Sequence, residues 1–205
     1  MDRQRVIELR ALLAGTGWVE RTHAFARALR HAPHDVGGLL LVGPPENEPW
    51  HLAAHLTDEA RLCGVPQLAP SLVRWSPPPD APAHLSIGLE RLEAAGRHDT
   101  LLIVAPDTAP ANLLERAADA RRAGATLFSV VGDDEELPEL SHESLLVRAD
   151  NGLVVPDFDT VCHFVSTAAG EEHASRSRWR MLRDRLARAL DLGAERDDEP
   201  DWAME

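Results

Sequence analysis

The chain contains no lysine and no tyrosine, only two cysteines, and 4% aromatic residues among its 205 residues. Without lysine it can form neither a Schiff base nor a lysine anchor for phosphate. The cysteines, Cys63 and Cys162, are too few for a disulfide framework and form no CxxC pair, so we expect buried free thiols. No apolar run approaches the ~18 residues of a membrane-spanning helix, and the first residues lack a signal-peptide layout. We therefore expect a soluble, cytoplasmic protein with no membrane partner.

Basic residues are scarce: all 21 are arginine, and the formal net charge is −13. Such a charge opposes binding to nucleic acid or to an anionic membrane, because both need a basic surface. The chain is 44% hydrophobic, which is enough to bury a full core. Its length suits one domain, 1–190, followed by an acidic tail, 191–205, that we expect to be mobile. Within the domain we expect an N-terminal pair of helices at about 1–32 and an arginine-rich helix at about 175–190.

The most informative segment runs from Asp99 to Val147. It contains an apolar run at 100–104, a helix pattern at 111–123 that ends at Gly124, and a second apolar run at 125–131. This order predicts one βαβ unit, whose first loop lies at the ligand-binding edge of a parallel sheet. Further strands are predicted at 39–42, 66–69 and 145–147, and further helices at 2–14, 18–30, 50–63, 84–95 and 158–169. The pattern predicts a three-layer αβα sandwich of flavodoxin type, with a five-stranded, mostly parallel sheet preceded by two N-terminal helices.

Several local phrases carry a family resemblance. Gly38–Gly43 is similar to a first strand with a glycine exit, and Trp50–Leu56 is similar to the pattern H-x-A-A-E-L in the helix that follows. The stretch 136–141, Glu-Leu-Pro-Glu-Leu-Ser, is similar to an E-L-A-E-L-A turn. In these motifs the chain resembles the SIS (sugar isomerase) domain family, and most of all its phosphoheptose isomerase branch. The resemblance covers about residues 1–170. The resemblance implies a carbohydrate-like ligand and a homodimer or homotetramer, since SIS domains usually build their ligand sites between subunits.

The phosphate-binding loop of that family, S-x-S-G-x-[ST], corresponds here to residues 105–112, Ala-Pro-Asp-Thr-Ala-Pro-Ala-Asn. Two prolines lack amide donors, the glycine is absent, and Asp107 would repel a phosphate by about 4 kcal/mol per unit-charge pair. A second interpretation is that Asp107 and Thr108 simply cap the following helix. Both interpretations predict the loss of phosphate binding. The candidate ligand-binding residues at this edge are Gly43, Asn47, Asp107, Thr108 and Asn112.

The loop after the first predicted strand also differs from the family's pattern in a way that disfavours phosphate binding. The family's G-N-G-G-S type loop is replaced by 43–49, Gly-Pro-Pro-Glu-Asn-Glu-Pro, which adds two acids. Two independent departures predict that phosphosugar isomerisation is lost. Glu46, Glu48, Asp58 and Glu59 could each supply a general base, but the sequence assigns no catalytic residue.

A metal site is a further possibility. His51 and His55 are four residues apart on a predicted helix and so share one face, a spacing that suits zinc. They also match positions where phosphoheptose isomerases resemble H-x-x-x-E and hold zinc. The resemblance suggests His163 as a third ligand, with Asp159 nearby. The alternative is that these are ordinary helix histidines and that the protein needs no cofactor.

Three functions remain open from the sequence. The first is a non-catalytic SIS-like protein that either binds a carbohydrate derivative or has a regulatory role. The second is an active sugar-phosphate isomerase with a rebuilt, metal-dependent site. The third is an adaptor that acts through the arginine-rich helix 175–190 and the acidic tail, where Trp202 could dock a partner protein. We expect the first of these, and thus a protein without enzymatic activity.

Overall fold

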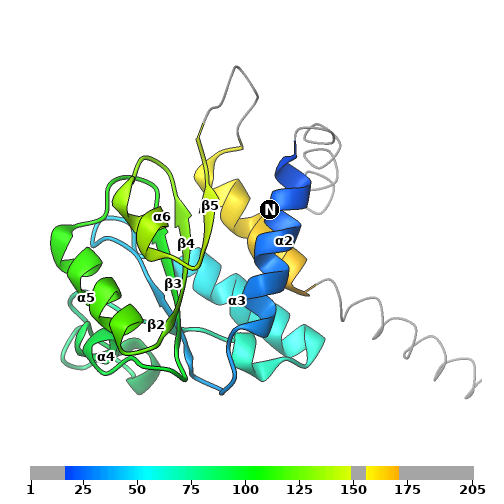
Figure 1. Cartoon of the computed structure of the whole chain (residues 1–205). Coiled ribbons are helices and arrows are strands. Elements are labelled where there is room, and N and C mark those ends of the chain that lie inside the picture. Colours follow the sequence, from blue (N-terminus) through cyan, green and yellow to red (C-terminus); the bar gives the residue numbers. More distant parts are fainter. Residues whose placement is uncertain (1–16, 149–155, 171–205) are drawn as a thin grey trace, which may run out of the picture.

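The computed structural model describes residues 17–148 and 156–170, which form a parallel sheet between two layers of helices (Figure 1). The helix predicted at 2–14, the arginine-rich helix and the acidic tail lie outside the described residues. Of the two expected N-terminal helices, the second is present as α2, Trp18–His31. The α/β sandwich predicted from the sequence is confirmed.

The sheet has five strands in the order β2-β1-β3-β4-β5, and every neighbouring pair is parallel. This is the flavodoxin-type order, in which the chain builds outward in both directions from β1 and β3. The central strands are buried on both faces, as the continuous apolar runs in the sequence indicate. The strands are β1 (Leu39–Val42), β2 (Ser71–Leu72), β3 (Thr100–Ala105), β4 (Thr126–Val131) and β5 (Glu143–Leu146).

One face of the sheet is covered by α2, by α3 (Trp50–Cys63) and by a helix at 158–170 that follows β5 in the chain (Figure 1). Phe25 of α2 meets Phe128 of β4 edge-on, with ring centroids 5.5 Å apart. Leu56 of α3 and Val165 of the last helix belong to the same core and are fully buried. This layer therefore positions α3 and helix 158–170 beside each other.

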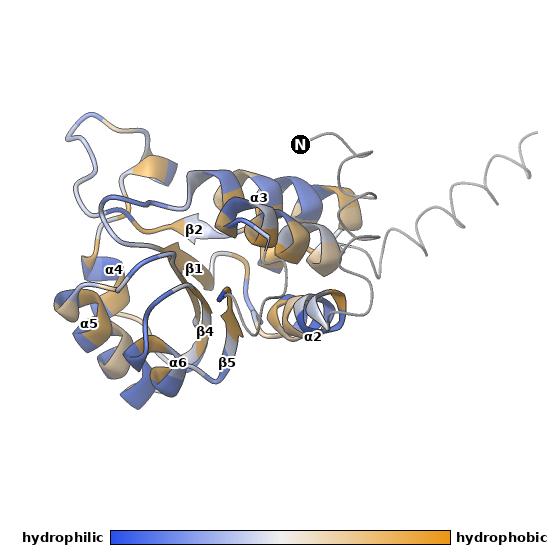
Figure 2. Cartoon of the chain, turned by 90° about the horizontal axis from the view of Figure 1, so that it is seen from above, coloured by the Kyte–Doolittle hydropathy of each residue, from blue (hydrophilic) through white to orange (hydrophobic). Residues whose placement is uncertain are grey.

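The opposite face is covered by α4 (Glu90–Glu93), α5 (Ala111–Arg122) and α6 (Glu136–Leu140). One leucine from each helix, Leu92, Leu113 and Leu137, is fully buried in a second core. Figure 2 shows apolar strands between helices that carry hydrophilic residues on their outer faces. Alternate strand residues serve the two cores, because successive side chains point to opposite faces.

The helix α3 ends where the sequence places a glycine. Gly64 has φ 66° and so adopts the left-handed conformation that side chains other than glycine rarely tolerate. The Val65 amide then donates to the Ala60 carbonyl at 2.9 Å, which gives a carbonyl group in the last turn of α3 a hydrogen-bond partner. The predicted boundary at 63 is confirmed.

The far turn of the helix at 158–170 contacts the two other helices of its layer. Buried Arg30 of α2 donates to the carbonyl oxygen of Ala169, and the thiol of Cys63 donates to the carbonyl oxygen of Gly170 at 3.0 Å. A Cβ on Gly170 would lie 2.1 Å from the Glu59 carboxylate, so a larger residue here would shift the Glu59 side chain. Residues 169 and 170 are thus bound to both α2 and α3.

Two predicted elements are wrong. The stretch 66–69, predicted as a strand, forms a 3₁₀ turn at Pro66–Leu68, and the strand β2 follows it. The helix predicted at 84–95 is reduced to a 3₁₀ turn at Ala83–Leu85 and to α4. The carbonyl of Ile87 accepts the Arg74 amide at 2.8 Å, and this long-range pairing holds the middle of the segment in an extended form.

Among the helices in the described part of the chain, none combines the length and the apolar character that crossing a membrane requires.

Candidate functional site

A cavity of about 610 Å³ lies at the carboxyl edge of the sheet, beside the ends of β1 and β3. From β1 the chain runs to α3 on one face, and from β3 it runs to α5 on the other. Ligands of open parallel sheets bind at such a divergence. Hydrogen-bonding side chains dominate the lining, and they come from Asn47, Glu48, Trp50, His51, His55, Asp157, Asp159, Thr160, Cys162 and His163. The remaining lining residues are Pro49, Leu52, Val104, Pro106 and Phe158.

The loop between β1 and α3 is shaped by close backbone packing at Gly43. A Cβ on Gly43 would lie 2.5 Å from the carbonyl oxygen of Asn47 and 2.9 Å from that of Val104, so a larger residue would displace the loop. The Trp75 indole donates to the Gly43 carbonyl at 2.6 Å. Gly43 does not line the cavity; it holds the turn that brings Asn47 to the lining.

Glu48 is bound within the protein rather than presented to a ligand. Its carboxylate accepts from the Arg74 guanidinium at 3.3 Å and from the Trp75 amide at 3.0 Å. Arg74 also lies over the Trp50 ring, 4.6 Å from the centroid. These contacts neutralise the charge of Glu48 and fix the loop against the segment after β2.

The loop between β3 and α5 does not present its polar side chains to the cavity, although the sequence predicted that it would. Asp107, Thr108 and Asn112 are exposed and do not line the cavity, and from this loop only Pro106 does. The interpretation of Asp107 and Thr108 as helix caps is wrong, because α5 begins after Pro110 without a side-chain cap. The residues that resemble a phosphate loop therefore do not assemble at the cavity.

Two contacts from the β4 side explain this placement. The Ala109 amide donates to the carboxylate of Asp134 at 2.7 Å, and the same carboxylate accepts the Leu137 amide at 2.7 Å. Asp134 is only 1% exposed. A Cβ on Gly132 would lie 1.9 Å from the carbonyl oxygen of Pro106, so the two loops touch backbone to backbone. The amide that an anion would seek in this loop is already bound to an internal carboxylate.

The start of helix 158–170 contributes the other wall of the cavity. Asp157 caps it, accepting from the Thr160 amide at 2.9 Å and from the Thr160 hydroxyl at 2.6 Å. Burial, with added repulsion from Asp159 and then Asp157, raises the pKa of the Cys162 thiol to about 12. The thiol therefore stays protonated at neutral pH and adds no negative charge. Both cysteines are free and buried, as predicted.

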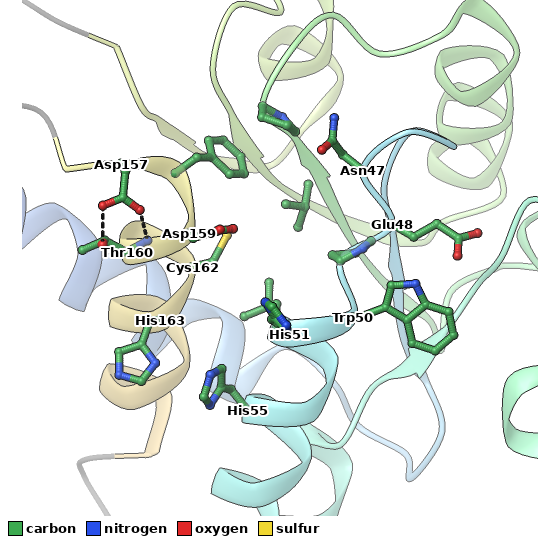
Figure 3. A pocket seen from close by; sticks show the side chains of 15 residues that line it. Asn47, Glu48, Trp50, His51, His55, Asp157, Asp159, Thr160, Cys162 and His163 are labelled. Atoms are coloured by element: carbon green, nitrogen blue, oxygen red, sulfur yellow. Dashed lines mark hydrogen bonds between the residues drawn. The ribbon is translucent and has the colours of Figure 1, made fainter. Parts of the chain in front are cut away.

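Three histidines line the cavity, and two of them are in contact (Figure 3). The rings of His55 and His163 meet edge-on, with centroids 4.7 Å apart, and they come from α3 and from helix 158–170. His51 lies one turn before His55 on α3. The structure thus brings the three predicted metal ligands to one cavity, and Asp159 also lines it.

The described side chains do not form a complete set of zinc ligands. Structural and catalytic zinc sites need at least three protein ligands that converge on one point. Among residues 17–148 and 156–170, no group of three or more histidine, cysteine, aspartate or glutamate side chains is arranged to hold a metal ion. The zinc site on His51, His55 and His163 stays a prediction, and no step below uses a metal.

Comparisons with known proteins add likenesses of fold. No protein-family model and no curated protein sequence matches the chain. A crystal structure of a provisionally assigned phosphosugar isomerase from Salmonella typhimurium LT2 is 14% identical with a TM-score of 0.47, covering 74% of this chain and 44% of that one. The Vibrio vulnificus NanR protein in complex with ManNAc-6P is 13% identical with a TM-score of 0.43, covering 96% and 66%. The chain spans less than two thirds of the length of either protein.

Sequence reasoning missed part of the lining. Asn47 and the three histidines were selected, but Trp50, Thr160 and Cys162 were not. The helix at 158–169 is predicted from the sequence, and the pattern Asp157-Phe158-Asp159-Thr160 is a capping signal that supports its start. The order of strands then places that start at the carboxyl edge beside α3.

Proposed function

We propose that this chain is a non-catalytic binding or regulatory protein whose cavity holds a small, hydroxyl-rich ligand without phosphate, such as a carbohydrate derivative. Its volume of about 610 Å³ falls within the range of small-molecule sites, roughly 300–1,000 Å³. The lining offers imidazoles, an amide, a hydroxyl and carboxylates. Such a mixture of donors and acceptors suits a ligand with several hydroxyl groups.

One observation supports the proposal that the ligand carries no phosphate. The internal carboxylate of Asp134 accepts the Ala109 amide, in the loop where a phosphate group would need free amides. No arginine is among the described residues that line the cavity, while Asp157 and Asp159 are. A phosphate would therefore meet repulsion without a compensating donor.

The contacts of two acidic residues support a binding protein rather than an enzyme. Glu48 is held by Arg74 and Trp75, and Asp157 caps the helix, so both serve structural contacts. One specific observation favours a second candidate, an isomerase of unphosphorylated sugars. The imidazoles of His55 and His163, 4.7 Å apart at the cavity, could move a proton between neighbouring carbons of a sugar.

A matched pair of variants tests the binding site. Asn47→Ala removes an amide from the lining, whereas Asn112→Ala removes one from the exposed start of α5. Titration calorimetry with a panel of monosaccharides and their 6-phosphates should find a binder among the unphosphorylated sugars. We expect Asn47→Ala to weaken it about five- to tenfold, the worth of one hydrogen bond, and Asn112→Ala to leave it unchanged.

Three results would overturn the proposal: no binding across the panel, binding of the phosphorylated members alone, or equal loss in both variants. Incubation of the bound sugar in D₂O separates the two candidates. Enediol chemistry would place deuterium on the ligand carbon, whereas a binding protein leaves the ligand spectrum unchanged.

A further inference from the structure

The charge of the cavity indicates a more specific ligand, and this step rests on the proposed function. Three carboxylates line the cavity, on Glu48, Asp157 and Asp159. No arginine lines it among the described residues, and the chain has no lysine at all. The three histidines are the only other lining groups that could carry positive charge. Among the described residues, carboxylates are therefore the only lining groups of fixed charge.

The three carboxylates are not equivalent. Arg74 neutralises Glu48 at 3.3 Å, and its other oxygen accepts the Trp75 amide. Both oxygens of Asp157 accept hydrogen bonds from Thr160 at the helix start. Asp159 has no arginine partner within ion-pair distance in the described part of the chain, and its charge acts on the Cys162 thiol. Asp159 is thus the carboxylate left to balance a charge from outside the protein.

Asp159 also faces the groups that would hold the rest of a sugar. Figure 3 places it on the first turn of helix 158–170, next to Cys162 and across the cavity from α3 with His51 and His55. A cationic group beside Asp159 would therefore meet a carboxylate that no described arginine neutralises.

We propose that the ligand carries a protonated amine, as an amino sugar does, and that Asp159 is the residue that selects it. The ammonium would donate to the Asp159 carboxylate, a charge-assisted hydrogen bond that a hydroxyl in the same place replaces with a weaker neutral one. Because Asp159 is exposed, the gain is modest: about fivefold in affinity over the hydroxyl analogue. Salt screens the interaction, so the preference declines as ionic strength rises.

Matched sugar pairs test the preference in the full chain. The probes are glucosamine with glucose, mannosamine with mannose, and galactosamine with galactose, titrated calorimetrically at neutral pH and low salt. We expect at least one amino member to bind about fivefold more tightly than its hydroxyl partner. Asp159→Asn should bring the pair to equal affinity. Asp80→Asn removes one charge from an exposed loop position outside the cavity and should leave the ratio unchanged.

The outcomes separate this inference from the function on which it rests. Equal binding of both members by the wild-type protein overturns the amine preference and leaves a neutral-sugar site standing. A preference that survives Asp159→Asn overturns the role of Asp159. Absence of binding by all six sugars, and by the wider panel above, overturns both proposals. A melting temperature of Asp159→Asn equal to that of Asp80→Asn excludes loss of the fold as the cause.

Discussion

The backbone amide of Ala109 donates a 2.7 Å hydrogen bond to the buried carboxylate of Asp134. The bond joins the loop after β3 to the loop after β4, and it places a fixed internal anion where an external one would bind. A carboxylate that satisfies two buried amides stabilises both loops, because each amide would otherwise be buried without an acceptor.

The first prediction concerns this carboxylate. Asp134→Ala leaves the amides of Ala109 and Leu137 without their acceptor, and we expect the free energy of unfolding to fall by about 3 kcal/mol. Urea unfolding followed by circular dichroism measures the loss. Asp133→Ala, at the exposed neighbouring position, should change stability by less than about 0.5 kcal/mol. Equal midpoints for the two variants would contradict the internal-anion interpretation.

The second prediction compares two glycines. A Cβ at Gly132 would lie 1.9 Å from the carbonyl oxygen of Pro106, whereas a Cβ at Gly96 would lie at an ordinary 3.6 Å from that of Ala123. We expect Gly132→Ala to destabilise the protein by about 2 kcal/mol or more, because the two loops must separate. Gly96→Ala should stay within about 0.5 kcal/mol of the wild type. Thermal melts of both variants give the comparison, and a neutral Gly132→Ala would show that the loops do not touch.

The third prediction concerns alkaline pH. The Cys162 thiol ionises near its ordinary pKa of 9.0 when unfolded, but its pKa is about 12 when folded. Stability linked to Cys162 is therefore complete below pH 9 and is lost as the pH rises from 9 toward 12. We expect a loss of about 1 kcal/mol between pH 8 and pH 10.

The matched variant for this prediction is Cys162→Ala. Burial also raises the pKa of Cys63, so some alkaline loss remains in the variant. The difference between wild type and variant isolates the contribution of Cys162. Parallel stability curves across pH 8 to 10 would refute the raised pKa.

The fourth prediction concerns metal removal. Because no cluster of three suitable ligands exists in the described ranges, we expect dialysis against EDTA to leave the melting temperature and sugar binding unchanged. The opposite result has a clear signature: a lower melting temperature that zinc alone restores, and that His55→Ala no longer shows. That result would establish the predicted zinc site on His51, His55 and His163.

The sequence predicted those elements whose signals are local. Helix α3 is periodic and ends at Gly64, and β3 and β4 are apolar runs separated by a helix pattern and Gly124. These features need no information from distant residues. The parallel sheet and its sandwich of helices follow from their order.

What the sequence could not predict depends on contacts between distant residues. The orientation of Asp107 and Thr108 is set by Gly132 and Asp134, more than twenty residues later in the chain. The helix expected at 84–95 is interrupted because Arg74 pairs with Ile87. Neither contact leaves a periodic signal, so the loop that resembles a ligand loop was assigned to the cavity by analogy alone.

Helix 158–170 joins two places that are far apart in the protein. Its first turn carries Asp159 at the cavity, and residues 169 and 170 are bound to Arg30 and Cys63 on the neighbouring helices. Thirteen helical residues span about 18 Å, so a movement at one of these points is transmitted to the other if the helix moves as a rigid element. Pivoting it by about 10° at the cavity would move residue 170 by about 3 Å, given that span, and would break its hydrogen bond with Cys63. Occupancy of the pocket could in this way alter the contacts of Arg30 and Cys63 with residues 169 and 170.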